Sequence, residues 1–506
     1  MTDVELLAPP DQPLTKHIFY LVYPFRTAVD DFDNLENWKF YTGRLTDDEL
    51  GREVRDSYTF LPHARQPLYS TLRAHFGDGS ASLRRDYQEC RGSIRFTLRS
   101  VLKSRFAPTS ATVFKADGTA VFVNLETGWI DVILYPPGFG FLIYQFHTYN
   151  LSVETAGILH RSIKKVLFRE RLRVKPPILH GLPGGDADWS DLLSELLADF
   201  CVDLDSEYSQ IHASSFRVVS MALVAALGDD TLRFGNIHGI EEGHLISLIT
   251  GEDLSHLSHP GKDLVDAARN SGRLKYWRDW SGVFLWDDVA YIGEETEFTR
   301  TSLVHNVEAL YVPLFVFTLF QHARLHGISH SLTDLAASES LNHAVFLSKL
   351  ERLNEDLLRF RSNYVFWEVS RAPVIIALFR HMIESFGTNH LFDQIERDLQ
   401  RAYLQESKYS QERLARIVGV VTFVTLPISA LLGIFNESVR DTLSESWQRW
   451  LCLFVVVCTS VVIAFWAIGI PAWIECLFRW LDNHRSEFCR RGWRSVADRF
   501  LFGHRP

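Results

Sequence analysis

Two long runs without a charged residue constrain the fold of this 506-residue chain more than any other feature. One runs from Ile417 to Asn436 and the other from Leu451 to Ile470. About 20 apolar residues in a helix cross the hydrocarbon core of a bilayer, because each residue rises about 1.5 Å and the core is about 30 Å thick. We therefore expect two transmembrane helices, at residues 414–436 and 450–473.

The charges that flank these runs predict their orientation. Arginine and lysine are frequent before the first run and in the tail at 474–506, whereas the loop at 437–449 is short and acidic. Positive charge stays on the cytoplasmic side of a membrane. The N-terminus also lacks the basic and apolar regions of a secretory signal. We expect a protein of the cell inner (plasma) membrane, in contact with membrane lipid, with both termini in the cytoplasm.

The overall composition limits what the rest of the chain does. A formal net charge of -10 argues against a general nucleic-acid binder, so no nucleic-acid partner is expected. A mean hydropathy of -0.03 argues against membrane segments throughout the chain. A third apolar run, Val307 to Phe320, is short for a span and contains Glu308 and Pro313, so a buried core helix is the favoured interpretation.

Residues 1–300 mix strand and helix signals and predict an α/β (α+β) cytoplasmic domain. Alternating apolar and polar residues from Ala111 to Tyr149 predict a β-meander of three or four strands. Its breaks are expected at Asp117-Gly118, at Thr127-Gly128 and at Pro136-Pro137-Gly138.

Three further segments of this domain carry clear signals. Trp189 to Phe200 has large apolar residues at helical spacing and predicts an amphipathic helix. Gly282 to Ile292 is typical of a pair of strands. Lys175 to Asp186 is rich in proline and glycine and predicts a loop.

From residue 301 the pattern turns helical, and 301–413 is predicted to form a helical stalk. From Thr388 to Asn436 the only glycine and proline residues are Gly419, Pro427 and Gly433, all inside the first apolar run. One helix on the order of 70 Å long is therefore expected to continue from the cytoplasm into the bilayer. A helix of that length needs partners along it, which favours an oligomer.

The first apolar run carries its polar residues on a single stripe. At a period of 3.5 residues, every Thr, Ser and Asn of the run aligns on one side, together with one leucine. The stripe consists of Thr422, Thr425, Ser429, Leu432 and Asn436. Such a stripe lines a pore in one interpretation. In the other, it packs helices together through small and hydroxylated residues.

These residues give the segment 388–475 a resemblance to the CorA superfamily of magnesium and related divalent-cation transporters. The family motif is Pro-x-Thr-x-x-x-Gly-Ile-aromatic-Gly-Met-Asn, followed by a short acidic loop and a second span. The residues that match its first part at the same spacing are Pro427, Ser429, Gly433, Ile434 and Phe435. The resemblance implies a CorA-like funnel, a homopentamer whose first span lines the pore, and a transported or regulatory divalent cation such as Mg²⁺, with no bound cofactor.

The end of the motif departs from the family. Gly-Met-Asn, the signature that binds hydrated magnesium at the pore mouth, falls on Asn436, Glu437 and Ser438. Together with Gly433 and Phe435, these residues form the expected pore mouth and selectivity region. Asn436 would replace the family's asparagine with a two-residue slip. Glu437 would add a ring of carboxylates that attracts divalent cations, whereas the identity of the ion does not carry over.

The strongest basic cluster outside the tail is the run from Arg161 to Lys175. An anionic ligand such as a small nucleotide would contact its cationic side chains. They are Arg161, Lys164, Lys165, Arg169, Arg171 and Arg173. A solvated helix face or a contact with anionic lipid explains the same run.

Candidate metal ligands are spread over several places, and the sequence leaves the metal site unknown. Three histidines at helical spacing, His322, His326 and His330, would allow a shared metal, but packed or solvated histidines are favoured. Acidic pairs would allow regulatory cation sites, although loops and solvated faces are the favoured interpretation. The pairs are Asp203/Asp205, Asp229/Asp230, Asp287/Asp288 and Glu294/Glu295.

No enzyme is expected, because the chain has no GxxxxGK[ST], no GxGxxG and no recognisable nucleophile–His–acid motif. The prediction is a CorA-like channel or transporter for a divalent metal cation, passive and gated by its cytoplasmic domain. The alternative is a CorA-like membrane effector of a defence system, gated by a nucleotide signal.

Overall fold

The computed structural model of the chain describes a set of segments that fall into two compact units, Met1–Leu399 and Gln400–Pro506. The described residues are 13–27, 35–41, 56–75, 87–89, 92–115, 118–164, 177–200, 216–224, 273–274, 280–285, 288–337, 343–366, 368–438, 450 and 454. The first unit has the mixed α/β content that the sequence predicts.

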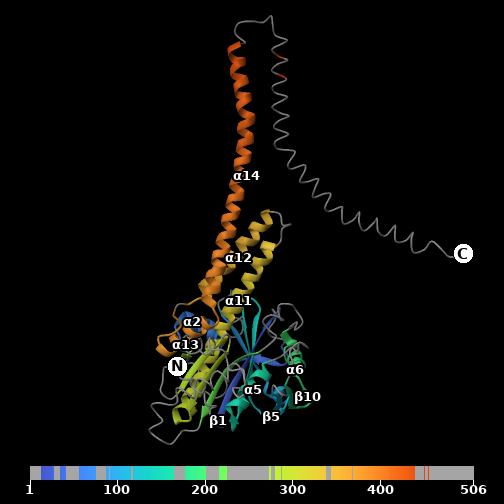
Figure 1. Cartoon of the computed structure of the whole chain (residues 1–506), viewed down its shortest axis with the longest axis vertical. Helices are drawn as coiled ribbons and strands as arrows, with labels where there is room; N and C mark the ends of the chain where they lie inside the picture. Colours follow the sequence, from blue (N-terminus) through green and yellow to red (C-terminus); the bar gives the residue numbers. More distant parts are fainter. Residues whose placement is uncertain are drawn as a thin grey trace, which may run out of the picture. The chain divides into compact units, whose positions relative to one another are not determined.

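A mixed sheet of ten strands forms the centre of the first unit (Figure 1). Its strand order is β12-β13-β14-β11-β1-β7-β6-β3-β2, and β8 pairs with β1. The strands are β1 Pro13–Arg26, β2 Trp38–Phe40, β3 Ile94–Leu98, β6 Glu126–Tyr135, β7 Phe139–Thr148, β8 Leu151–Ser152, β11 Arg217–Val224, β12 Arg273–Leu274, β13 Trp280–Leu285 and β14 Asp288–Glu294. Neighbours are antiparallel except β11 and β14, which are parallel. The predicted strand pair at 282–292 is confirmed as β13 and β14.

The central strands are apolar along most of their length because both faces of the sheet are covered. In β7, FGFLIYQFHT, every residue except His147 is buried. Near-continuous apolar runs are typical of strands buried on both sides, whereas alternation marks strands with one wet face. The register sets Phe19 opposite Phe146 and Tyr23 opposite Leu142 across β1 and β7.

The predicted meander from Ala111 to Tyr149 is wrong in its connectivity. Four strands exist, but β4 (Ser110–Phe114) and β5 (Ala120–Asn124) belong to a separate four-stranded sheet, ordered β10-β9-β4-β5. The expected break at Thr127-Gly128 is instead an irregularity inside β6, and the chain changes sheets at Leu125. Apolar alternation indicates that a segment is a strand, but it does not say which strand it pairs with.

The predicted loop from Lys175 to Asp186 is also wrong where it is described. Ile178–Leu182 forms β9 and Gly185–Ala187 forms β10, and the two pair as a hairpin. Gly181 and Gly185 both have positive φ. The glycines that suggested a loop therefore shape a tight hairpin, because glycine adopts that backbone region without steric cost.

One face of the main sheet packs against the small sheet and against α5 (Val153–Ile163) and α6 (Trp189–Leu196). The helix predicted at 189–200 is confirmed as α6 followed by the short 3₁₀ helix η2 (Ala198–Phe200). All six of its apolar residues at helical spacing are buried: Trp189, Leu192, Leu193, Leu196, Leu197 and Phe200. Two short helices, η1 (Ser100–Leu102) and α4 (Lys103–Phe106), lie between β3 and β4 in the chain.

The opposite face of the sheet carries a layer of helices. They are α2 Pro62–His75, η4 Thr299–Leu303, α10 Val304–Asn306, η5 Val307–Tyr311, α11 Val312–Ala337, α12 His343–Tyr364 and α13 Pro373–Ser385. In this layer α12 packs against α11. Tyr135 of β6 stacks on Phe320 of α11 with 4.3 Å between ring centroids. Among the described residues, one helix, Thr299–Ala337, is long and apolar enough to cross a membrane. Of its most apolar 18-residue stretch, 72% is buried inside the protein. That burial agrees with the core helix predicted for the third apolar run.

Helix α14, Thr388–Ser438, is a single helix of 51 residues. It confirms the prediction of one uninterrupted helix that enters the first apolar run, and its length is on the order of 75 Å. It starts directly after Gly387, whose positive φ ends α13. Apart from Trp450 and Phe454, the predicted second span and the basic tail lie outside the described residues.

Candidate functional site

The predicted pore-lining stripe lies on α14. Thr422 and Thr425 are both exposed on the single chain, and the hydroxyl of Thr425 donates to the carbonyl of Val421 at 2.8 Å. Ile417 and Val421 are also more than half exposed. Large apolar side chains that are this exposed are normally covered by lipid or by other helices. The backbone remains helical through Ser438, but the side chains of Ser429, Leu432, Gly433, Phe435, Asn436, Glu437 and Ser438 lie outside the described ones.

The described part of the basic run is tied into the fold. Lys164, at the end of α5, forms an ion pair with Asp288 of β14. The same carboxylate accepts a hydrogen bond from the backbone N–H of Val218 at 2.7 Å. Asp288 therefore joins α5, β11 and β14. Arg161 is half-buried on α5, and Lys165, Arg169, Arg171 and Arg173 lie outside the described residues.

The three histidines predicted at helical spacing all lie on α11. The rings of His322 and His326 meet at 4.4 Å between centroids, and His330 pairs with Asp334 at 2.9 Å. Burial lowers the pKa of His326, which favours its neutral form. No group of three potential metal ligands occurs among the described residues. These findings agree with the favoured interpretation of packed histidines.

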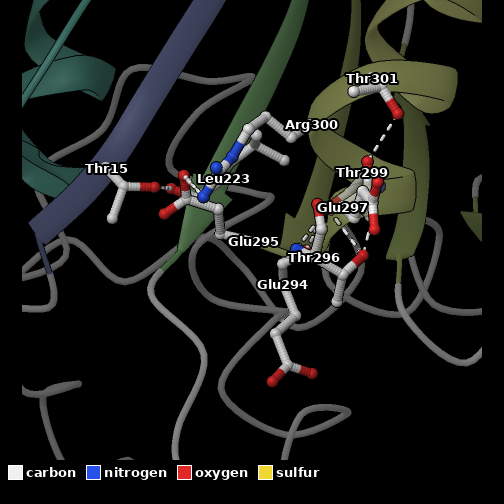
Figure 2. Close-up of polar contacts among 9 residues, drawn as sticks. All are labelled: Thr15, Leu223, Glu294, Glu295, Thr296, Glu297, Thr299, Arg300 and Thr301. Carbon is white, nitrogen blue, oxygen red and sulfur yellow. Dashed lines mark hydrogen bonds and ion pairs between the residues drawn. The ribbon is translucent and has the colours of Figure 1, made fainter.

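Of the acidic pairs, only the last is described completely. Glu295 pairs with Arg300 at 2.9 Å (Figure 2). Asp288 is engaged by Lys164, and Asp287, Asp203/Asp205 and Asp229/Asp230 lie outside the described residues.

The last strand of the sheet passes almost directly into the helical layer. The backbone N–H of Thr296 donates to the hydroxyl of Thr299 at 2.8 Å, and the backbone N–H of Thr299 donates to the hydroxyl of Thr296 at 3.2 Å (Figure 2). The Thr299 hydroxyl also bonds the carbonyl of Glu294, the final residue of β14. This reciprocal cap satisfies backbone donors at a helix start. It also ties the start of η4 to the end of β14.

Two π-helical turns follow this cap, and the second has a cause in the sequence. In a regular helix the carbonyl of Ala309 would accept from residue 313, but Pro313 has no N–H and its ring crowds that carbonyl. The turn before it is widened, with the N–H of Val312 bonded to the carbonyl of Val307, five residues back. The hydroxyl of Tyr69 in α2 donates to the Ala309 carbonyl instead.

Glu308 projects from this widened turn to the sheet. One carboxylate oxygen accepts from the indole N–H of Trp129 at 3.1 Å, and the other accepts from the amide of Gln145 at 3.2 Å. The Gln145 amide also donates to the buried hydroxyl of Tyr20 at 3.1 Å. Hydrogen bonds to a charged acceptor are stronger than neutral ones. Glu308 therefore joins strands β6, β7 and β1 to the helical layer.

A buried ion pair lies beside this cluster on the same face of the sheet. Arg95 of β3 reaches the fully buried Asp131 of β6 at 2.5 Å. The guanidinium lies over the ring of Tyr41 at 4.2 Å and near the ring of Trp129 at 5.4 Å. Packing against aromatic rings fits the cation, so Trp129 connects this pair with Glu308.

Contacts from α11 reach Phe386, which lies two residues before the start of α14. Phe315 and His322 of α11 contact the ring of Phe386, with centroids 5.6 and 5.8 Å apart. Phe386 follows α13 and is separated from Thr388, the first residue of α14, by Gly387 alone. The first unit thus contains a continuous path of contacts from the sheet, through Glu308 and α11, to the start of α14.

Two residues of the contact between η5 and the sheet already stood out in the sequence. Glu308 and Pro313 are the polar and helix-breaking residues that interrupt an otherwise apolar run. Trp129 and Gln145 could not be assigned to Glu308, because they lie 179 and 163 residues away in the chain.

No model of a known protein family matches the chain, and no curated protein is significantly similar to it.

Proposed function

We propose that the chain is a CorA-like channel for a divalent metal cation, Mg²⁺ or a related ion, passive and gated by its cytoplasmic α/β domain. The feature of the structure that supports this proposal most is helix α14. It is one helix that begins in the α/β unit and carries a hydroxylated stripe into an uncharged apolar run. Its exposed apolar residues, such as Ile417, need lipid or partner helices as cover.

In this proposal the first span lines a pore formed by several copies in the inner membrane, and both termini lie in the cytoplasm. Thr422, Thr425 and Ser429 offer hydroxyls to a hydrated cation, and Asn436 and Glu437 stand at the mouth. A ring of carboxylates raises the local concentration of divalent cations and disfavours anions.

The test is divalent-cation entry into liposomes that contain the purified protein and an internal magnesium- or zinc-sensitive dye. Wild-type protein should admit cations down a gradient, and Glu437→Ala should reduce the rate by about tenfold or less, because one ring is removed from a wide electrostatic field. Glu445→Ala, in the same loop, is the matched control. An equal rate of cation entry in all three proteins would show that Glu437 does not act at the pore mouth.

A second function is favoured by the altered signature. Asn436, Glu437 and Ser438 stand where the family has Gly-Met-Asn, so a constitutive magnesium pore is not the only use of this scaffold. In the alternative, the α/β unit binds a nucleotide signal and opens the membrane segments in a defence response. A thermal-shift screen with cyclic and adenylated nucleotides separates the two. Stabilisation by one nucleotide, with cation entry only in its presence, would establish the effector.

A further inference from the structure

We propose that Thr112, His180 and Asp186 form a hydrolytic site on the outer face of the small sheet, and that it takes esters with a short apolar acyl group. No sequence motif marks this site, because 68 residues separate Thr112 from His180 in the chain. Its activity does not require a pore, so this site and the proposed function can be tested separately.

The three side chains form a chain of hydrogen bonds across neighbouring strands. The hydroxyl of Thr112 on β4 lies 2.8 Å from Nε2 of His180 on β9. Nδ1 of the same ring lies 2.6 Å from a carboxylate oxygen of Asp186 on β10. A carboxylate only accepts hydrogen bonds, so Nδ1 carries the proton, and Nε2 of the neutral ring accepts from the hydroxyl. A hydroxyl, a histidine and an acid in these roles form the arrangement of a hydrolytic triad, which recurs on unrelated folds.

The small sheet presents these groups to solvent. Ala111, Val113 and Leu179 of β4 and β9 belong to the core, so Thr112 and His180, which alternate with them, lie on the outer face. Strand β4 pairs with β5 on one side and with β9 on the other, which fixes the backbone at Thr112. Thr112 is partly exposed, and the side chain of His180 is 24% exposed. A small molecule can therefore approach the hydroxyl from solvent.

Apolar side chains flank the hydroxyl on the same face. The register places Phe122 of β5 and Ile178 of β9 directly opposite Thr112. Phe122 is 62% exposed and Ile178 is 37% exposed. The ring of Phe122 stacks on that of His180, with 5.9 Å between centroids. A short hydrocarbon chain would cover part of this apolar surface when bound, which favours an apolar acyl group over a charged one.

The reaction transfers an acyl group to water in two steps. In the first, the Thr112 oxygen adds to the ester carbonyl while its proton passes to Nε2 of His180. The bond from the acyl carbon to the leaving oxygen then breaks, and His180 gives that oxygen its proton, which releases the alcohol. In the second, water adds to the acyl group on Thr112 and gives a proton to His180. The ring returns this proton to the Thr112 oxygen as the free acid leaves.

Two further side chains stabilise charge during these steps. Asp186 accepts from Nδ1 and stabilises the positive ring that forms when His180 takes the proton. Asn124 lies on the same face as Phe122, two residues further along β5, and is exposed. Its amide can donate to the carbonyl oxygen as that oxygen becomes negatively charged.

The test is the hydrolysis of p-nitrophenyl butyrate by the full-length protein in detergent. Thr112→Val keeps the shape of the side chain, removes the nucleophile, and should lower the rate by about 100-fold, as should His180→Gln. Asp186→Asn should lower it by only about 10-fold, because Asp186 is 64% exposed and water replaces part of its effect. The matched control is Thr301→Val, which removes an exposed hydroxyl bonded to the carbonyl of Glu297 (Figure 2) and should leave the rate unchanged.

A fluorophosphonate probe gives a second measurement. Peptide mass spectrometry should locate its adduct on Thr112 in the wild type and find none there in His180→Gln. Equal hydrolysis by the wild type and Thr112→Val, which is also the result of a contaminating esterase, would overturn the site. An adduct only on other residues would overturn it as well. Thr112→Val fills the same space as threonine, so it still decides the question if His180→Gln does not fold.

The acyl group is tested with p-nitrophenyl acetate and butyrate side by side. The wild type should prefer butyrate, and Phe122→Ser should reduce that preference, because part of the apolar surface beside Thr112 is lost. An unchanged preference in Phe122→Ser would overturn the assignment of the acyl group to this face.

Discussion

The amide of Gln145 occupies space that exists because residue 128 has no side chain. A Cβ built on Gly128 would lie 2.1 Å from the Oε1 atom of Gln145. The irregularity that the sequence marked as a turn is thus the place where β6 makes room for the partner of Glu308. A glycine inside a strand commonly marks such a close approach.

Gly128→Ala should therefore destabilise the α/β unit by about 1–3 kcal/mol, since it displaces Gln145 and leaves buried polar groups without their partners. Urea denaturation measures the change in the free energy of unfolding. Gly184→Ala is the control, because nothing lies within 4 Å of its Cβ position. Equal stability of the two variants would show that Gln145 adapts without cost.

His17 provides a pH-dependent contribution to stability. It is fully buried on β1, and its ring lies 4.9 Å from that of His160. Burial, with the charges of His160 and His147, lowers the pKa of His17 well below the usual value of 6.5. Protonation therefore favours the unfolded chain. This contribution is complete above about pH 6.5 and is lost as the pH falls towards the folded-state pKa.

We expect the free energy of unfolding to fall by up to about 1.4 kcal/mol per pH unit below pH 6.5 through this residue. The His17→Phe variant, with the ring of Phe19 as a neighbour, removes the titrating group. Its urea midpoints at pH 7.5, 6.5 and 5.5 should fall less steeply than those of the wild type. Parallel slopes would assign the acid sensitivity to other groups.

At the scale of elements, most patterns within one segment were predicted correctly, apart from the loop expected at 175–186, whereas pairings between distant segments were not. The face of α6, the strands at 280–294 and the 51-residue helix α14 all follow from local spacing. The split of the predicted meander between two sheets does not follow from local spacing, because β4 and β6 each pair with a strand outside the meander, β9 and β3 respectively. The described stripe residues Thr422 and Thr425 lie on the predicted helix, whereas the Glu308 junction required the folded sheet.

Asp288 connects three elements, and its loss should be costly. Its side chain is 5% exposed, and it engages Lys164 and the N–H of Val218. Asp288→Ala leaves a largely buried ammonium group uncompensated, so we expect a loss of about 3–5 kcal/mol. Arg300→Ala breaks the exposed pair with Glu295 and should cost about 1 kcal/mol or less. Urea denaturation of both proteins checks the difference, and similar losses would contradict it.

At the scale of the whole molecule, the exposed apolar surface of α14 needs cover by lipid or by other helices. The resemblance to the CorA superfamily predicts five copies of the 58.2 kDa chain. Native mass spectrometry from detergent, with light scattering corrected for bound detergent, should give a pentamer. A monomer that is stable at micromolar concentration would exclude a pore formed around several copies of α14.

The position of β1 in the centre of the sheet has a consequence for how the protein is made. Among the described strands β1 comes first in the chain, yet it lies between β7 and β11, with Leu14 opposite Val224. Pairings between such distant segments form slowly. β1 must therefore wait, partly unpaired, until β11 (Arg217–Val224) has been synthesised. Because β14 ends at Glu294, the described strands of the sheet are all made well before the first apolar run, so the sheet can form before that run leaves the ribosome.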